Sequence, residues 1–143
     1  GQLRLMYLLD TNFVSELRRP DRADRNVLAW AQGVVGVPAF LSAITILEVE
    51  IGLRRLERRD PEQAAPLRRW FETDLMAEYK DRILPVDVPV ARQAAALHVP
   101  DRRPENDALI AATALVHRLT LVTRNTADFQ PMGVRVINPW GPL

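Results

Sequence analysis

Asp10 is an acidic residue that directly follows an apolar run, residues 6–9, with the composition of a buried parallel strand. In parallel α/β sheets, functional groups lie beyond the carboxyl ends of the strands, where the chain leaves the core and meets solvent. Asp10 is therefore placed where a catalytic or metal-binding carboxylate is expected. The alternative is that Asp10 only caps the following helix, because aspartate accepts hydrogen bonds from the free N–H groups at helix starts.

Glu48 is a second acid in an unusual position. In the helix expected at residues 44–59, it lies on an apolar face beside Gly52, counting about 100° per residue. Burial of a carboxylate is costly without compensation. Glu48 therefore either pairs with a buried arginine, serves a metal ion or borders a cleft. Glu50, on the same helix, is expected to be solvated and paired with Arg54 four residues on.

Asp107 opens a helix expected at residues 105–116, which is apolar on every face and should pack on the sheet. It is either a partner of the helix dipole or a second active-site carboxylate. Polar residues also follow the buried strand expected at 119–123. There, Asn125 is either a turn residue or part of the site, and Asp128 is either a cap or surface charge or part of the site.

Carboxylates gathered in one place indicate a particular chemistry. Without a cation they repel one another and take up protons. Their hard oxygen atoms select Mg²⁺ or Mn²⁺, and such ions activate water and stabilise the leaving oxygen of a phosphodiester. The sequence has no cysteine, and His98 and His117 lack the spacing of zinc ligands.

The elements that must position these residues alternate between strand and helix, which predicts a mostly parallel α/β sheet of about five strands. The helices expected at 44–59 and 61–79 form a long helical hairpin suited to self-association, and Pro85 places the third strand near an edge. The expected strands are 6–9, 39–43, 83–87, 119–123 and 134–137, and the expected helices are 11–18, 24–32, 44–59, 61–79, 88–98 and 105–116.

Length and composition predict one domain, residues 1–143, without a membrane span or an export signal, and a cytoplasmic location. Residues 1–5 precede Met6, a suitable start, and are either a native extension or a foreign remnant. The net charge of +1 does not by itself indicate nucleic-acid binding. Lys80 is the only lysine; the many arginines reflect either phosphate contacts or a GC-rich genome. The basic run at 54–59 is either a solvated helix face or a phosphate-contacting edge.

Four blocks of the sequence resemble the signature blocks of PIN domains: residues 8–12 (Leu-Leu-Asp-Thr-Asn), 42–52, 107–114 and 123–129. The resemblance is strongest to VapC-type toxins of bacterial toxin–antitoxin pairs, including the FitB-like branch, whose chains also end near Asn-Pro-Trp. It covers Met6 to Trp140. It implies a three-layer α/β/α fold, an Mg²⁺- or Mn²⁺-dependent endoribonuclease, a homodimer and inhibition by a small VapB-type antitoxin.

The resemblance also implies roles for individual residues. Asp10, Glu48 and Asp107 match the three metal-coordinating acids of the family. The fourth family position is often aspartate; here it is Asn125, whose carbonyl oxygen can ligate but adds no charge, with Asp128 as the alternative. The family's supporting hydroxyl groups are matched by Thr11, Thr45 and Thr123.

Three other classes of protein are weaker interpretations. A haloacid-dehalogenase-type phosphotransferase needs an aspartate at the position of Asn12 and a catalytic lysine late in the chain, and this sequence has neither. A receiver domain needs an acidic pair before its first helix and a lysine after its last strand, and neither is present. A PIN-like module that binds an antitoxin or RNA without cutting it stays open, and a metal-dependent cleavage assay distinguishes it from a nuclease.

Overall fold

The computed structural model describes residues 5–141, so residues 1–4 of the segment interpreted as an extension or remnant lie outside the described part. The sheet has five parallel strands in the order β3-β2-β1-β4-β5. The strands are β1 (Tyr7–Leu9), β2 (Ala39–Ser42), β3 (Ile83–Leu84), β4 (Thr120–Val122) and β5 (Val136–Ile137). The expected parallel five-stranded sheet is confirmed, with β3 at an edge.

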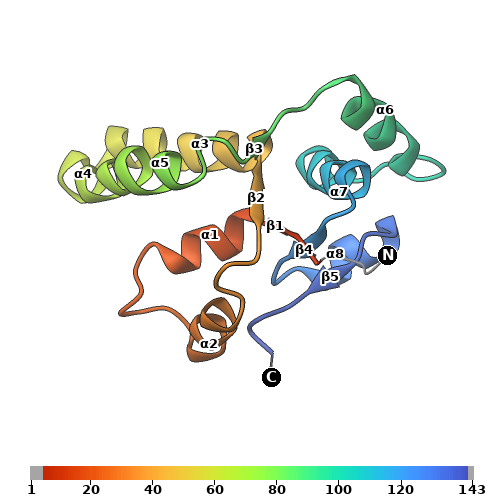
Figure 1. Cartoon of the computed structure of the whole chain (residues 1–143). Coiled ribbons are helices and arrows are strands. Elements are labelled where there is room, and N and C mark those ends of the chain that lie inside the picture. Colours follow the sequence, from red (N-terminus) through yellow and green to blue (C-terminus); the bar gives the residue numbers. More distant parts are fainter. Residues whose placement is uncertain (1–4, 142–143) are drawn as a thin grey trace.

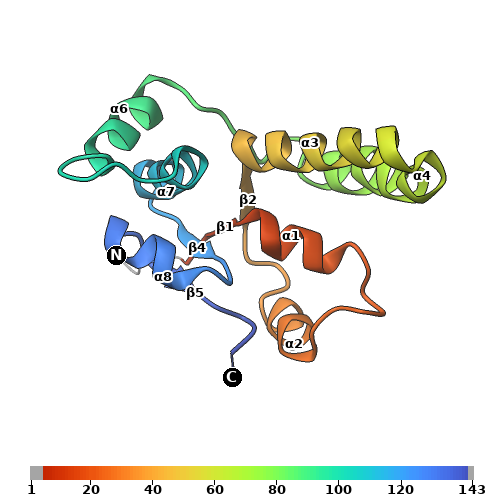
Figure 2. The same ribbon diagram turned by 180° about the vertical axis from the view of Figure 1, so that it is seen from behind.

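The helices cover both faces of this sheet, which confirms the three-layer α/β/α fold (Figures 1 and 2). They are α1 (Thr11–Leu17), α2 (Arg25–Gly33), α3 (Ala43–Arg59), α4 (Pro61–Arg69), the π-helical η1 (Trp70–Leu75), α5 (Met76–Glu78), α6 (Val88–Leu97), α7 (Glu105–His117), α8 (Thr126–Phe129) and the 3-10 helix η2 (Gln130–Met132). No helix among residues 5–141 is long and apolar enough to cross a membrane.

The core consists of two main layers, because successive strand residues point to opposite faces of the sheet. Tyr7 and Leu9 of β1 join one buried cluster with Phe13 of α1 and Phe71 of η1. Leu8 points to the other face, where it packs with residues of α7. Because β1 is central and fully buried, Asp10 at its end is held between β2 and β4 rather than at the rim of the molecule.

The helical hairpin differs from the expected pair of regular helices. Its second arm, expected as one helix at 61–79, contains the π-helical segment η1, in which Met76 N–H bonds to the carbonyl of Phe71. The Thr73 hydroxyl donates to the carbonyl of Arg69 at 2.6 Å. Such side-chain competition for a helix carbonyl disturbs the regular helix, and insertion of one wide turn is a common result.

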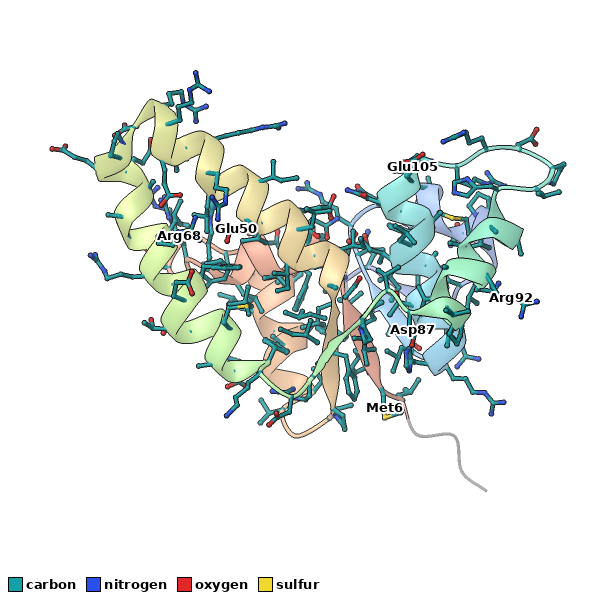
Figure 3. The ribbon with its side chains drawn as sticks, turned by 90° about the horizontal axis from the view of Figure 1, so that it is seen from above. Met6, Glu50, Arg68, Asp87, Arg92 and Glu105 are labelled. Atoms are coloured by element: carbon teal, nitrogen blue, oxygen red, sulfur yellow. The ribbon has the colours of Figure 1, made fainter. Side chains whose placement is uncertain are left out.

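The ion pairs of the hairpin extend the expectation for Glu50. Arg54 lies 3.6 Å from Glu50, but Arg68 of α4 lies closer, at 2.7 Å, and links the two arms (Figure 3). Arg68 also contacts Glu57 at 2.7 Å. The expected i,i+4 pair with Arg54 is therefore present, but the sequence did not show the closer partner Arg68, which comes from another helix. The four arginines of residues 54–59 are exposed, as a solvated face requires.

Candidate active site

Asp10 lies at the carboxyl end of the central strand and is 5% exposed. Its backbone N–H continues the sheet by bonding to Val122 at 2.9 Å. Its Oδ1 accepts the N–H of Thr11 at 2.8 Å, so Asp10 does cap α1. Burial raises the pKa of Asp10 to about 6; the bonds from Thr123 and Thr11 oppose this rise, and the charges of Glu48 and Asp107 add to it.

Thr123 ties the end of β4 to this carboxylate. Its hydroxyl donates to Asp10 Oδ2 at 2.7 Å and accepts the N–H of Asn125 at 3.0 Å. Asn12 completes the bridge: its Nδ2 lies 3.2 Å from Asp10 Oδ2 and 3.3 Å from Thr123 Oγ1. Its Oδ1 accepts the N–H of Arg124 at 3.3 Å. The two strand ends are thus joined by side chains as well as by the sheet.

Asn12 is a site residue that sequence reasoning missed. It entered that reasoning only as a member of a motif and as a departure from phosphotransferases, with no role of its own. The available signal was its position, two residues after a strand-ending aspartate on the first turn of a helix. From there an amide reaches both the aspartate and the next strand end, and it supplies a donor and an acceptor at once.

Glu48 of α3 is held by a residue at the start of α1. The Thr11 hydroxyl donates to Glu48 Oε1 at 2.6 Å. Thr45 Oγ1 lies 3.2 Å from Thr11 Oγ1 and can donate to it, because the single hydroxyl proton of Thr11 is used on Glu48. Residues 5–141 contain no ion pair that involves Glu48. Of the three threonines expected to support the acids, Thr123 bonds to Asp10 and Thr11 bonds to Glu48. The third, Thr45, contacts the hydroxyl of Thr11.

A hollow of about 240 Å³ borders Glu48 and runs between α1 and the hairpin. Thr11, Ser15, Arg18 and Arg59 are among the residues that line it. Glu48 therefore borders a cleft and has no ion pair with a buried arginine among the described residues, and the metal-binding role stays a prediction. The apolar face expected around Glu48 is half open, since Leu47 is 45% exposed and Ile51 is 38% exposed.

Asp107 lies in the first turn of α7 and is partly buried. Burial raises its pKa, and the charges of Asp128 and Glu48 raise it further. The charge that Asp128 contributes comes from the first turn of α8. Asn125, at the start of α8, is exposed and bonds to Thr123 through its backbone N–H. The short helix α8 itself was not expected, because four residues are too few to show a helical period.

Together these acids form a site of uncompensated negative charge. The charges of Glu48 and Asp107 raise the pKa of Asp10, those of Asp128 and Glu48 raise the pKa of Asp107, and no basic group is among the causes of either shift. The donor set suits a hard divalent cation. Within residues 5–141, no three such side chains stand close enough to surround one ion. A site for Mg²⁺ does not require three, because this ion usually keeps several waters and takes one or two carboxylates plus substrate phosphates.

Comparisons with known proteins agree over almost the whole chain. A profile described as PIN domain matches residues 7–132. Toxin FitB of Neisseria gonorrhoeae is 38% identical over 94% of this chain and 99% of its own. The VapC ribonuclease Y4jK of Sinorhizobium fredii is 33% identical over 96% of this chain and 99% of its own.

Solved structures give the same result. The crystal structure of FitAcB from Neisseria gonorrhoeae matches with a TM-score of 0.85 and 36% identity, over 94% of this chain and 99% of that one. A structure of FitAB bound to a DNA fragment matches with a TM-score of 0.86 and 34% identity, over 96% and 98%. The chain belongs to the PIN domain family, in the branch that contains the FitB and VapC toxins.

Proposed function

We propose that this chain is a metal-dependent endoribonuclease and the toxin of a toxin–antitoxin pair. The observation that carries the proposal is the buried Asp10 at the carboxyl edge of the sheet, hydrogen-bonded by Thr123 and Thr11, with the charges of Glu48 and Asp107 raising its pKa. Support comes from relatives that are named ribonucleases. A buried acid without a basic partner, as Asp10 is, is costly for a fold, so its presence favours a bound cation and a function over a structural role.

Asp10, Glu48 and Asp107 would hold Mg²⁺ or Mn²⁺, with Asn125 or Asp128 completing the site. When bound, the ion supplies an activated water and stabilises the leaving oxygen of an RNA phosphodiester. The protein prepares the ligands. The Thr123 hydroxyl and the Thr11 N–H fix both oxygens of Asp10, and the Thr11 hydroxyl fixes one oxygen of Glu48. Such outer hydrogen bonds orient ligand atoms, and those to Asp10 also oppose the rise of its pKa.

The proposed partner is a small VapB-type antitoxin. Support comes from solved structures of similar fold, which include FitAB and VapBC bound to DNA. We further propose a homodimer and a cytoplasmic location, where the RNA substrate is found. The hairpin of α3 and α4 extends away from the sheet and offers a long surface for self-association (Figure 1).

Cleavage of total RNA by the purified protein tests the proposal, with Mg²⁺, with Mn²⁺ and with EDTA. We expect cleavage that needs metal, that is absent from Asp10→Asn and Asp107→Asn, and that persists in Asp101→Asn, which removes an exposed loop carboxylate. Comparing Asp128→Asn with Asn125→Asp identifies the fourth position. Cleavage at the parental rate by Asp10→Asn would refute the assignment. A folded protein that binds RNA but cuts none would be a binding module instead.

A further inference from the structure

Arg124 is an exposed cation at the carboxyl edge of the sheet, one residue beyond Thr123. Its backbone is fixed, since its N–H bonds to Asn12, which also contacts Asp10. Its guanidinium lies over the ring of Trp140, 5.6 Å from the centroid. None of the ion pairs within residues 5–141 involves Arg124. Arg124 is therefore a cation on the same edge of the sheet as Asp10, joined to it through Asn12 at its backbone, and no carboxylate among residues 5–141 pairs with it.

Trp140 is itself anchored. Its ring packs edge-on against Phe13 of α1, with centroids 6.2 Å apart. Its backbone carbonyl accepts a hydrogen bond from the side-chain amide of Asn26 on α2 at 3.2 Å. Its backbone N–H donates to the side-chain oxygen of Asn138 at 3.0 Å. The tryptophan is thus held by two helices and offers its ring to Arg124 as a fixed platform.

The stacking geometry leaves the arginine able to bind a ligand. Contact with a ring uses the flat face of the guanidinium, whereas its five N–H donors point outward from the rim. Stacking also restricts the rotation of a long side chain, so less conformational entropy is lost when the group binds an anion. A planar fork of donors in a fixed position is suited to the two oxygens of a phosphate.

We propose that Arg124, held by the Trp140 ring, binds a backbone phosphate of the RNA next to the one that is cut. The inference rests on the proposed ribonuclease function. Acids that bind a metal repel the flanking phosphates of the same strand, and a cation beside them offsets that repulsion. The contact involves the backbone and not the bases, so it holds the strand in register without reading its sequence.

Binding of a fluorescent single-stranded RNA of mixed sequence tests the inference, measured in EDTA at several salt concentrations so that no cleavage occurs. Arg124→Ala should bind about tenfold more weakly, as loss of a hydrogen bond to a charged group predicts. The slope of log affinity against log salt should fall by about 0.7, the value for one phosphate contact on a single strand. Arg124→Lys should restore the slope, because it restores the charge.

Two further variants separate binding from structure. Trp140→Leu keeps an apolar contact for Phe13 but removes the flat ring, so RNA binding should weaken while the melting temperature changes little. Arg92→Ala removes the same charge from α6, where the side chain points outward (Figure 3), and should bind like the parent.

The outcomes are distinct. If Arg124→Ala kept the parental affinity and salt slope while the parent cut RNA, the inference would be wrong and the proposed function would stand. Loss of melting temperature in Arg124→Ala with an unchanged slope would show that the stack only secures the chain. A parent that neither binds nor cuts RNA would refute the function and the inference together.

Discussion

The hydroxyl of Thr123 donates a 2.7 Å hydrogen bond to Oδ2 of Asp10, although the two residues are 113 positions apart in the sequence. Both groups are buried, and each stands at the end of one of two neighbouring parallel strands. The bond lowers the pKa of Asp10 against the effect of burial. It therefore favours the ionised carboxylate that the proposed metal site needs, at a position where burial favours the protonated acid.

Thr123→Val removes this donor at nearly constant volume. We expect the pKa of Asp10 to rise further and RNA cleavage near neutral pH to fall by about tenfold to a hundredfold, as for other groups that support metal ligands. The pH dependence of cleavage shows the effect, with the rising limb moved to higher pH. Thr113→Val is the matched control, since Thr113 is equally buried but bonds only to the carbonyl of Leu109 within α7. Equal losses in both variants would contradict the assignment.

Thr11→Val should act on Glu48. It removes the 2.6 Å bond to Glu48 Oε1 but leaves the backbone N–H that binds Asp10. We expect the Mg²⁺ concentration for half-maximal cleavage to rise about tenfold, with little change in the rate at saturating metal. Thr11→Ser keeps the hydroxyl and should behave like the parent. A metal titration of cleavage distinguishes the two, and identical curves for Val and Ser would argue against the role of the hydroxyl.

Asp10→Asn should stabilise the metal-free protein at neutral pH. The folded pKa of about 6 exceeds the ordinary value of 3.8, so the folded state binds the proton more tightly than the unfolded state. Stability of the parent therefore falls as pH rises from about 4 to 6, by about 3 kcal/mol for two pKa units. Asparagine cannot ionise and avoids this loss, although one lost hydrogen bond offsets about 1 kcal/mol.

Urea unfolding of both proteins in EDTA at several pH values checks this expectation. The variant should be more stable above pH 6 and should lose that advantage below about pH 4, where the parent is protonated in both states. A stability difference that does not vary with pH would mean that burial does not raise the pKa of Asp10.

Arg68→Ala should weaken the helical hairpin without affecting cleavage directly. Arg68 contacts Glu50, Glu57 and Glu72, and its hydrogen bonds lower the pKa of Glu57. We expect the melting temperature to drop by a few degrees at low salt and by less at high salt, because exposed ion pairs are screened. Arg54→Ala removes a side chain that is 74% exposed and 3.6 Å from Glu50, and it should change little. An equal effect of both variants would show that charge alone matters.

Much of the fold could be predicted from the sequence because it depends on local patterns. The apolar run before Asp10 and the buried strand before Asn125 are such patterns, and both strands occur as expected. The positions of the acids at strand and helix ends follow from the same reasoning. The family match covers residues 7–132. This range includes all four sequence blocks that resemble PIN domains.

The features that were missed depend on partners distant in sequence. Asn12 contacts Thr123 over 111 positions, and Glu50 prefers Arg68 of another helix to its neighbour Arg54. No periodicity encodes such pairs. Leu47 and Ile51 look like core residues on a helical wheel, but the hairpin extends beyond the sheet and leaves them open. Amphipathic spacing predicts a face and does not show what covers it.

The strand order has a consequence for the protein during its synthesis. The strand that carries Asp10 is translated first among the five, yet it pairs with β4, which emerges more than a hundred residues later. A nascent chain that has exposed only residues up to α7 carries all three main acids but lacks Thr123 and the strand that aligns it. The site of the proposed nuclease is therefore incomplete for most of elongation. We expect activity only once β4 has been released and inserted, so the interval in which an antitoxin would have to act begins late.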